Sequence, residues 1–254
     1  MARGGAKLAR PAVDEDFANP LQTIDPLGWL GGSIAGWRVL CLAAGGGRQS
    51  ALYAAAGARV TVLDISPEML ARDREVAAHR GYSVHAIEGS MDDLSMLPAA
   101  AFDAVVHPVS TCYLPDVQAV YRQVARVTRP GGLYVSQHKS PVSLQASLKP
   151  AGGGYAIQQP YYRDGPLPPA EQPSRLREPG TLEFLHRWEE LVGGLCRAGF
   201  AVEDLVEPMH ADAAAEPGAF GHRCRYVAPY VRIKARRAEG PSQDTAAGPK
   251  VVIA

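Results

Sequence analysis

Apolar and polar positions change period along the chain in a way that predicts alternating strands and helices. Short apolar runs predict buried strands, and the clearest of them, at 60–63, is rich in β-branched residues. Apolar residues at helical spacing over 115–128 give the strongest helical pattern. The predicted strands cover 37–42, 60–63, 82–87, 102–106, 133–136, 181–184, 200–206 and 225–234. The predicted helices cover 47–56, 67–80, 115–128 and 188–199, and a short helix or cap is expected within 20–34.

This alternation predicts an α/β fold with a doubly wound, Rossmann-like, mostly parallel sheet covered on both faces and joined by right-handed crossovers. Ligands of such sheets bind outside the carboxyl ends of the strands. The glycines at 45–47, Asp64, the turn at 90–92 and His107 all follow predicted strand ends. We therefore expect these residues to line one edge of the sheet.

The composition and charge of the chain limit the classes of partner that we expect it to bind. The 254 residues carry 26 Lys plus Arg and 26 Asp plus Glu, so no bulk charge favours nucleic acid or an anionic membrane surface. We find no apolar run of membrane-spanning length and no apolar region of a secretory signal after the N-terminus. The four cysteines lack the spacing of metal-binding pairs. The expectation is a cytoplasmic protein with free thiols, no metal, no nucleic-acid partner and no membrane partner.

The chain divides by composition into five parts. Residues 1–30 are expected to be partly mobile with a cap helix, and their apolar positions suggest a surface for a homodimer. Residues 31–138 form the core, and 181–235 complete the same domain with a helix and an antiparallel strand pair. Residues 139–180 are too long for a plain connection, and their tyrosines favour a lid over a disordered excursion. Residues 236–254 are polar and are expected to be disordered.

The glycine turn at 45–47 is the first candidate for chemistry. It follows an apolar strand and opens a helix, so backbone N–H groups there could face a ligand, and glycine lets a ligand approach closely. Asp64 ends the next strand, roughly 20 residues later, where an acid can bind ribose hydroxyls. This arrangement fits a nicotinamide dinucleotide or S-adenosylmethionine. Ser50 stands where the dinucleotide fingerprint has its last glycine, which does not decide between them.

The order of the later motifs resembles the class I S-adenosylmethionine-dependent methyltransferase family, in its small-molecule branch. The resemblance covers about residues 30–235 and implies a seven-stranded sheet whose last strand is antiparallel. Its motifs are the glycine turn, Asp64 within 62–70, Gly89-Ser90-Met91-Asp92-Asp93, Phe102-Asp103-Ala104-Val105-Val106, Arg129-Pro130-Gly131-Gly132-Leu133, Phe184-Leu185-His186-Arg187 and Ala198-Gly199-Phe200.

The resemblance implies S-adenosylmethionine as the cofactor and a set of residues that would bind it. These are Ala43, Gly45, Gly46, Gly47, Asp64, Ile65, Ser66, Met69, Ser90, Met91, Asp92 and His107. The chain departs from the family at Cys41, which replaces an acid, at Ala43, which replaces a glycine, and at Ser90, which replaces an aspartate. Backbone carbonyls of Ala43 and His107 are the expected substitutes for the missing acid, which usually holds the cofactor amino group.

The implied reaction transfers a methyl group to a hydroxyl, amine or carbon of a small-molecule acceptor. The residues expected to bind the acceptor are Tyr113, His138, Tyr161 and His186, and no catalytic residue is assigned. A general base, where one is needed, would come from His107, Tyr113, His138 or His186, although each histidine could equally be a hydrogen-bonded structural group. Three alternatives stay open, namely a peptide or protein methyltransferase, a catalytically silent S-adenosylmethionine-binding protein, and an NAD-dependent oxidoreductase.

Overall fold

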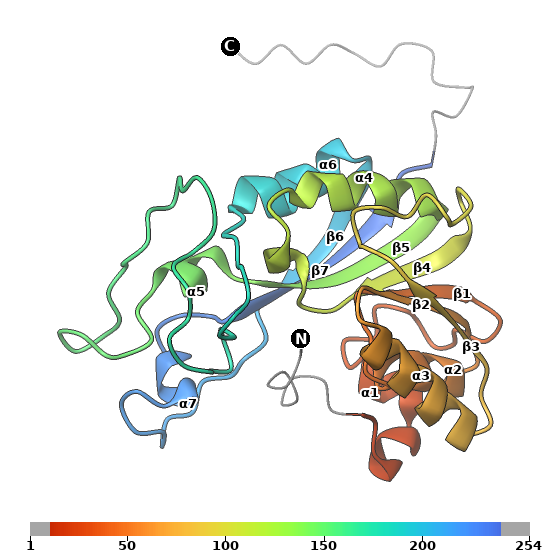
Figure 1. Ribbon diagram of the computed structural model, residues 1–254, viewed down its shortest axis with the longest axis horizontal. Helices are drawn as coiled ribbons and strands as arrows, with labels where there is room; N and C mark the ends of the chain where they lie inside the picture. The colour runs from red at the N-terminus through yellow and green to blue at the C-terminus, as the bar shows by residue number, and fades with distance from the viewer. Residues whose placement is uncertain (1–10, 240–254) are drawn as a thin grey trace, which may run out of the picture.

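The computed structural model describes residues 11–239 and contains a seven-stranded sheet with helices on both faces (Figure 1). The strands follow the order β3-β2-β1-β4-β5-β7-β6. β1 to β5 are parallel, and β7 inserts antiparallel between β5 and β6, as expected. The strand bounds are β1 Arg38–Leu42, β2 Arg59–Asp64, β3 Val84–Glu88, β4 Phe102–His107, β5 Thr128–Lys139, β6 Phe200–Val206 and β7 Tyr230–Arg237.

Two groups of helices cover the two faces of the sheet. Helices α1 (Pro20–Ile24), α2 (Gln49–Ala55) and α3 (Pro67–His79) lie together, while α4 (Val117–Val127) and α6 (Gly194–Arg197) lie above the opposite face (Figure 1). A π-helical turn, Glu189–Gly193, leads into α6, so the helix predicted over 188–199 is present with an irregular first turn. The remaining short helices are η1 Asp14–Phe17, η2 Thr111–Tyr113, α5 Pro141–Gln145 and α7 Phe220–Arg223.

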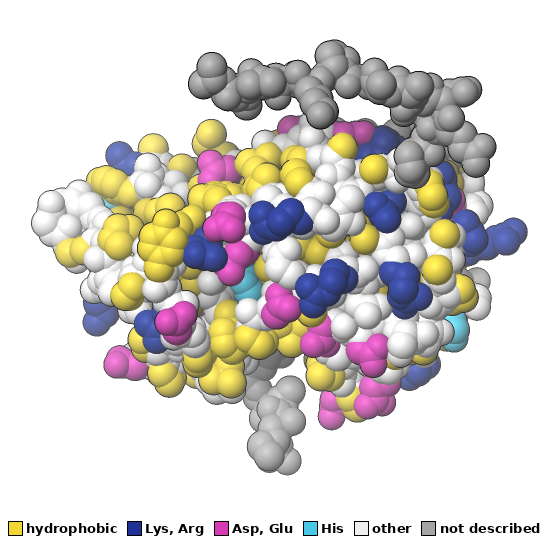
Figure 2. Space-filling view, turned by 90° about the horizontal axis from the view of Figure 1, so that it is seen from above, with side chains coloured by type: hydrophobic (Ala, Val, Ile, Leu, Met, Phe, Trp, Pro, Cys, Tyr) yellow, Lys and Arg dark blue, Asp and Glu magenta, His cyan; other side chains and the backbone are white. Residues whose placement is uncertain are grey.

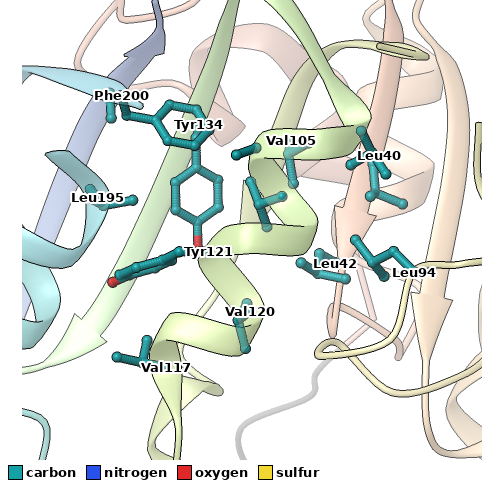
Figure 3. Close-up of a cluster of buried hydrophobic side chains, with 14 of the residues drawn as sticks. Leu40, Leu42, Leu94, Val105, Val117, Val120, Tyr121, Tyr134, Leu195 and Phe200 are labelled. Atoms are coloured by element: carbon teal, nitrogen blue, oxygen red, sulfur yellow. The ribbon is translucent and has the colours of Figure 1, made fainter. Parts of the chain in front are cut away.

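The larger core cluster lies between the sheet and α4. The stripe that predicted α4 is the buried face of that helix, and its N-cap Asp116 accepts a hydrogen bond from the Gln118 N–H at 2.8 Å. Tyr134 of β5 lies between two other rings, with centroids 6.1 Å from Tyr121 and 5.8 Å from Phe200 (Figure 3). The second cluster, on the side of α1–α3, includes Val39, Cys41 and Val62. Both faces of the central strands β1 and β4 are therefore covered, as their continuous apolar sequences require, whereas the edge strand β3 is only partly buried.

Two predicted strands begin at other residues in the structure, and one predicted strand does not form. β5 begins at Thr128 rather than 133, because α4 passes directly into the strand and Thr128 pairs with Phe102. No strand forms over 181–184, since Glu183 and Phe184 make single backbone hydrogen bonds to two different segments rather than a ladder. The last strand begins at Tyr230 rather than 225 and ends at Arg237, because α7 and its closing turns occupy the preceding residues.

The segment 139–180 is folded against the domain, and hydrophobic side chains gather on this side of the surface (Figure 2). A small apolar cluster joins Leu144 and Leu167 of this segment to Leu185, and Tyr161 packs against the cluster. The fully buried Glu183 carboxylate accepts hydrogen bonds from Lys139 Nζ at 3.0 Å and Arg177 Nε at 2.8 Å. This buried ion cluster fastens the segment to the end of β5.

The described part of the N-terminal segment contains η1 and α1, and α1 lies where a short helix or cap was expected within 20–34. Asp16 of η1 pairs with the Arg48 guanidinium, whose Nη2 lies 2.9 Å from Asp16 Oδ1. The outermost parts of both expected tails, residues 1–10 and 240–254, lie outside the described residues. Within residues 11–239, no helix is long and apolar enough to cross a membrane.

Candidate active site

Asp64 joins the glycine turn to the start of α3. Its Oδ2 accepts a hydrogen bond from the Gly45 N–H and its Oδ1 accepts one from the Ser66 N–H, both at 2.9 Å. The Ser66 hydroxyl separately caps α3 by accepting from the Met69 N–H at 3.3 Å. A carboxylate offers about four acceptor positions, so the half-buried Asp64 keeps capacity for further donors.

Asp73 of α3 holds the same turn from below. Its Oδ2 accepts from the Gly46 N–H and its Oδ1 from the Gly47 N–H, both at 3.0 Å, and the Ser50 hydroxyl also donates to Oδ1. The side chain is fully buried. Burial raises the pKa of the Asp73 carboxyl, and the hydrogen bonds from Ser50, Gly46 and Gly47 oppose that rise.

Sequence reasoning missed Asp73, although a signal was present. Leu70, Asp73 and Ala77 are the buried residues of α3 and follow helical spacing, so an acid stands within the stripe that faces the sheet. An acid at such a position requires buried donors, and the glycine turn supplies them.

These contacts correct the expectation that the turn presents free N–H groups. The N–H groups of Gly45, Gly46 and Gly47 all donate to carboxylates of the protein itself. A diphosphate would lose these donors and would also meet two carboxyl groups. A ligand that carries positive charge would meet a favourable field.

The backbone of the turn accommodates both departures from the family pattern. Ala43 adopts a left-handed conformation with φ of +47°, so the turn forms without the usual glycine, at some steric cost. Gly45 is required for space, since a Cβ there would lie 2.7 Å from Met69 Cβ and 2.9 Å from Asp64 Cγ. Cys41 is a fully buried strand residue, and burial raises the pKa of its thiol well above the usual value. It therefore offers no carboxylate at this position.

The other residues expected at the cofactor lie on the same edge of the sheet. Asp64 pairs in register with Glu88 at the end of β3, and the turn after β3 contains Ser90, whose hydroxyl donates to Asp92. Met91 is half-buried against the larger core cluster. Ile65 follows Asp64 and is 73% exposed among the described residues, so it offers an apolar surface beside the turn.

A hollow, here called the β4–β7 hollow, opens on the same face of the sheet as α1 and α2. The residues that line it are Ile24, Asp25, Pro26, Leu27, Trp29, Gln49, Tyr53, Val106, His107, Pro108, Val135, Ser136, Gln137 and Arg232. The N-terminal segment 24–29 forms the side of the hollow that faces the strands. Trp29 Nε1 fixes that segment by donating to Asp204 Oδ2 at 2.9 Å, and none of the lining residues comes from 139–180.

His107 lines this hollow and has both ring nitrogens engaged. Nδ1 lies 2.8 Å from Tyr134 Oη and Nε2 lies 2.6 Å from Ser110 Oγ. Because the Ser110 hydroxyl also lies 3.2 Å from the Pro108 carbonyl, to which it can donate, the consistent assignment has Nε2–H donating to Ser110 and Nδ1 accepting from Tyr134. Burial lowers the pKa of His107 to about 3, so the ring is neutral and has no free lone pair.

The four residues expected at the acceptor lie away from the β4–β7 hollow. Thr111 connects two of them, since its hydroxyl lies 2.8 Å from His138 Nδ1 and its carbonyl accepts from His186 Nε2 at 2.9 Å. Burial lowers the pKa of both histidines. Tyr113 lies beside Lys139, and Tyr161 accepts a hydrogen bond from the Trp188 N–H at 3.2 Å. Through these contacts His186 and Tyr113 join the 139–187 region to η2, while His138 joins η2 to β5.

Comparison with known proteins identifies the class of this fold and site. Residues 40–136 match the family model described as a methyltransferase domain. The chain is 37% identical over 177 residues to a Bacillus subtilis protein named "Uncharacterized methyltransferase YbaJ", covering 68% of this chain and 69% of the relative. It is 33% identical over 153 residues to a ubiquinone biosynthesis O-methyltransferase of Xanthomonas axonopodis pv. citri, covering 58% and 63%.

Solved structures agree with this assignment. An S-adenosylmethionine-dependent methyltransferase from Mesorhizobium loti superposes with a TM-score of 0.69 and 25% identity, over 87% of this chain and all of that structure. A Listeria monocytogenes structure shares the fold, with a TM-score of 0.65 and 16% identity over 87% of this chain and 99% of its own. The chain belongs to the class I S-adenosylmethionine-dependent methyltransferase family.

Proposed function

We propose that this methyltransferase binds S-adenosylmethionine across the carboxyl ends of β1, β2 and β3 and methylates a small molecule in the β4–β7 hollow. The observation that carries the proposal is the use of all three glycine-turn N–H groups by Asp64 and Asp73. That arrangement suits a sulfonium and an ammonium group and opposes the diphosphate of a nicotinamide dinucleotide.

The residues at this edge fit the cofactor. Asp64 has acceptor capacity left for the two ribose hydroxyls. The exposed Ile65 side chain supplies an apolar surface for the adenine ring, and Met69 borders the same turn. Asp92 is assigned to the adenine amino group, and the Met91 N–H to a ring nitrogen.

The cofactor amino group needs other acceptors, because Cys41 replaces the family acid. The backbone carbonyls of Ala43 and His107 are assigned this role, and the carboxyl groups of Asp64 and Asp73 add a negative potential near them.

When bound, the cofactor supplies an activated methyl group on its sulfonium, so the protein has to position the acceptor rather than perform covalent chemistry. The hollow suits a small molecule because the 24–29 segment closes it on the side away from the strands. A hydroxyl, amine or carbon nucleophile is compatible with this site, and the name of the Xanthomonas relative supports a small acceptor. His107 would line the site as a neutral ring and would not act as a general base, because both of its nitrogens are engaged by Tyr134 and Ser110.

Calorimetry tests the cofactor assignment. The wild type should bind S-adenosylmethionine and show no saturable binding of NADH. Asp64→Ala should weaken cofactor binding by tenfold or more, whereas Cys41→Ser should change it little, since Cys41 lies in the core. Undiminished cofactor binding by Asp64→Ala would refute the site.

An acceptor screen tests the second half of the proposal. S-adenosylhomocysteine release should be stimulated by members of a small-molecule library and not by peptides of mixed sequence. Stimulation by peptides alone would make the protein a peptide methyltransferase. Cofactor binding without stimulation by either set would favour a catalytically silent binder.

A further inference from the structure

Arg232 of β7 lines the β4–β7 hollow, and only part of its guanidinium is hydrogen-bonded within the described residues. It pairs in register with Gln137 of β5, and its Nε donates to Gln137 Oε1 at 3.0 Å. The side chain is half-buried. Its two terminal amino groups have no hydrogen-bond or ion-pair partner among residues 11–239. One edge of a planar donor group is therefore free inside a hollow.

Other arginines of the same strand differ in this respect. Arg236 pairs with Glu203 and also donates to the Gly131 carbonyl at 2.9 Å. Arg237 donates to backbone carbonyls, including that of Gly199 at 2.7 Å. Unlike these two arginines, Arg232 has donors that remain open to a partner from outside the described residues.

Asp25, the acid that lines the hollow, is not an ion-pair partner of Arg232 in the described structure. Both oxygens of Asp25 accept backbone hydrogen bonds, from the Trp29 N–H at 2.9 Å and the Leu30 N–H at 2.6 Å. Its carboxylate fixes the 24–29 segment, and no ion pair joins it to Arg232 in the described structure. A half-buried guanidinium with free donors is a strong site for a carboxylate, which accepts two parallel hydrogen bonds from it.

The order of the strands indicates which ligand supplies that carboxylate. Asp64 ends β2, and β1, β4 and β5 lie between it and β7. Since neighbouring strands lie about 4.8 Å apart, β7 is roughly 14 Å from β1 and farther from Asp64. The cofactor proposed above is held at β1–β3, so Arg232 lies at the far end of the hollow, beyond the methyl group.

We infer that the methyl acceptor is an acid whose carboxylate binds Arg232, with its apolar body against Trp29, Tyr53 and Val135 of the hollow. This inference rests on the proposed function and assigns the substrate class of the same site. Gln137 is a positioning residue that fixes the guanidinium through Nε and leaves the two amino groups directed at the ligand.

The test is calorimetry on protein saturated with S-adenosylhomocysteine. The probes are 4-hydroxybenzoate and 4-hydroxycinnamate, each compared with its primary amide. At least one acid should bind the wild type at least tenfold more tightly than its amide. Arg232→Met should abolish that preference, and Arg232→Lys should restore part of it. Arg225→Met is the matched control, since Arg225 is exposed, lies outside the hollow, and its loss changes the net charge equally.

Two results would overturn the inference. One is equal binding of acids and amides to the wild type, or a preference that persists in Arg232→Met. The other concerns the cofactor itself, which also has a carboxylate. If Arg232→Met weakened S-adenosylhomocysteine but not 5′-methylthioadenosine, which lacks the carboxylate, Arg232 would bind the cofactor instead. Failure of the wild type to bind S-adenosylhomocysteine would refute the proposed function, and is distinguishable from both results.

Discussion

Replacing Asp73 tests the central feature of the site, a buried carboxyl that holds the glycine turn. Asp73→Ala removes three accepted hydrogen bonds and leaves the N–H groups of Gly46 and Gly47 and the Ser50 hydroxyl buried without a partner. Each stranded donor costs about 1–3 kcal/mol, and release of the buried carboxyl recovers part of the sum. We expect the free energy of unfolding to fall by about 3–5 kcal/mol.

Chemical unfolding measures this loss, and milder variants keep the test informative if Asp73→Ala does not fold. Ser50→Ala removes a single hydrogen bond and should cost about 1 kcal/mol. Asp73→Asn should fall between the two, because its amide keeps one acceptor oxygen and presents its NH₂ to another donor. Glu75→Ala is the control, as Glu75 is exposed on the same helix and its removal should change stability by less than about 0.5 kcal/mol.

Replacing Asp73 should also weaken ligand binding. Where Asp73→Asn is folded, S-adenosylhomocysteine should bind about tenfold more weakly, because the turn no longer has one fixed conformation and binding has to order it. Glu75→Ala should bind as the wild type does. If Asp73→Ala and Glu75→Ala had the same stability and the same affinity, the reasoning about the turn would be wrong.

Three further predictions concern strain, burial and pH. Ala43→Gly should raise the free energy of unfolding by up to about 1 kcal/mol, because relief of the left-handed strain exceeds the added entropy of the unfolded chain, and a loss in chemical unfolding would contradict this. Glu183→Leu should lower it by about 3–5 kcal/mol by stranding the buried Lys139 ammonium, whereas Arg122→Ala, at an exposed pair, should change little. Since burial lowers the pKa of His107 from 6.5 to about 3, the unfolded state binds the proton more tightly, and stability should fall as pH drops from about 6.5 towards 3. His107→Gln should make that pH dependence shallower, and an unchanged slope would contradict the assignment.

Elements with a strong internal pattern could be predicted from the sequence. β2 and α4 were found because apolar spacing alone specifies them, and the helix predicted over 67–80 is α3. The start of β5 could not be found, because its first residues resemble a turn and become strand only by pairing with β4. Tertiary contacts decide such boundaries.

Some contacts of the site could be predicted from the sequence, whereas others could not because they depend on tertiary packing. The meeting of Gly45 with Asp64 followed from topology, since parallel strands end at one edge. Arg232 stands in a strand where charged residues alternate with apolar ones, a pattern typical of a solvent face, and only the packing of the 24–29 segment makes it part of a hollow. The predicted acceptor histidines are bonded to Thr111 or to neighbouring hydroxyls, and sequence alone could not separate that role from a catalytic one.

The replacement of the first-strand acid by Cys41 is understandable once Asp73 is considered. The Asp73 carboxyl lies close enough to Cys41 to raise the pKa of its thiol further, after burial has raised it. A carboxyl is therefore present beneath the glycine turn, and it comes from α3 rather than from β1. The two arrangements differ in one respect, because Asp73 is bonded to the turn itself and so fixes its conformation. The negative field at the turn is retained, and the proposed contact with the cofactor amino group is left to backbone carbonyls.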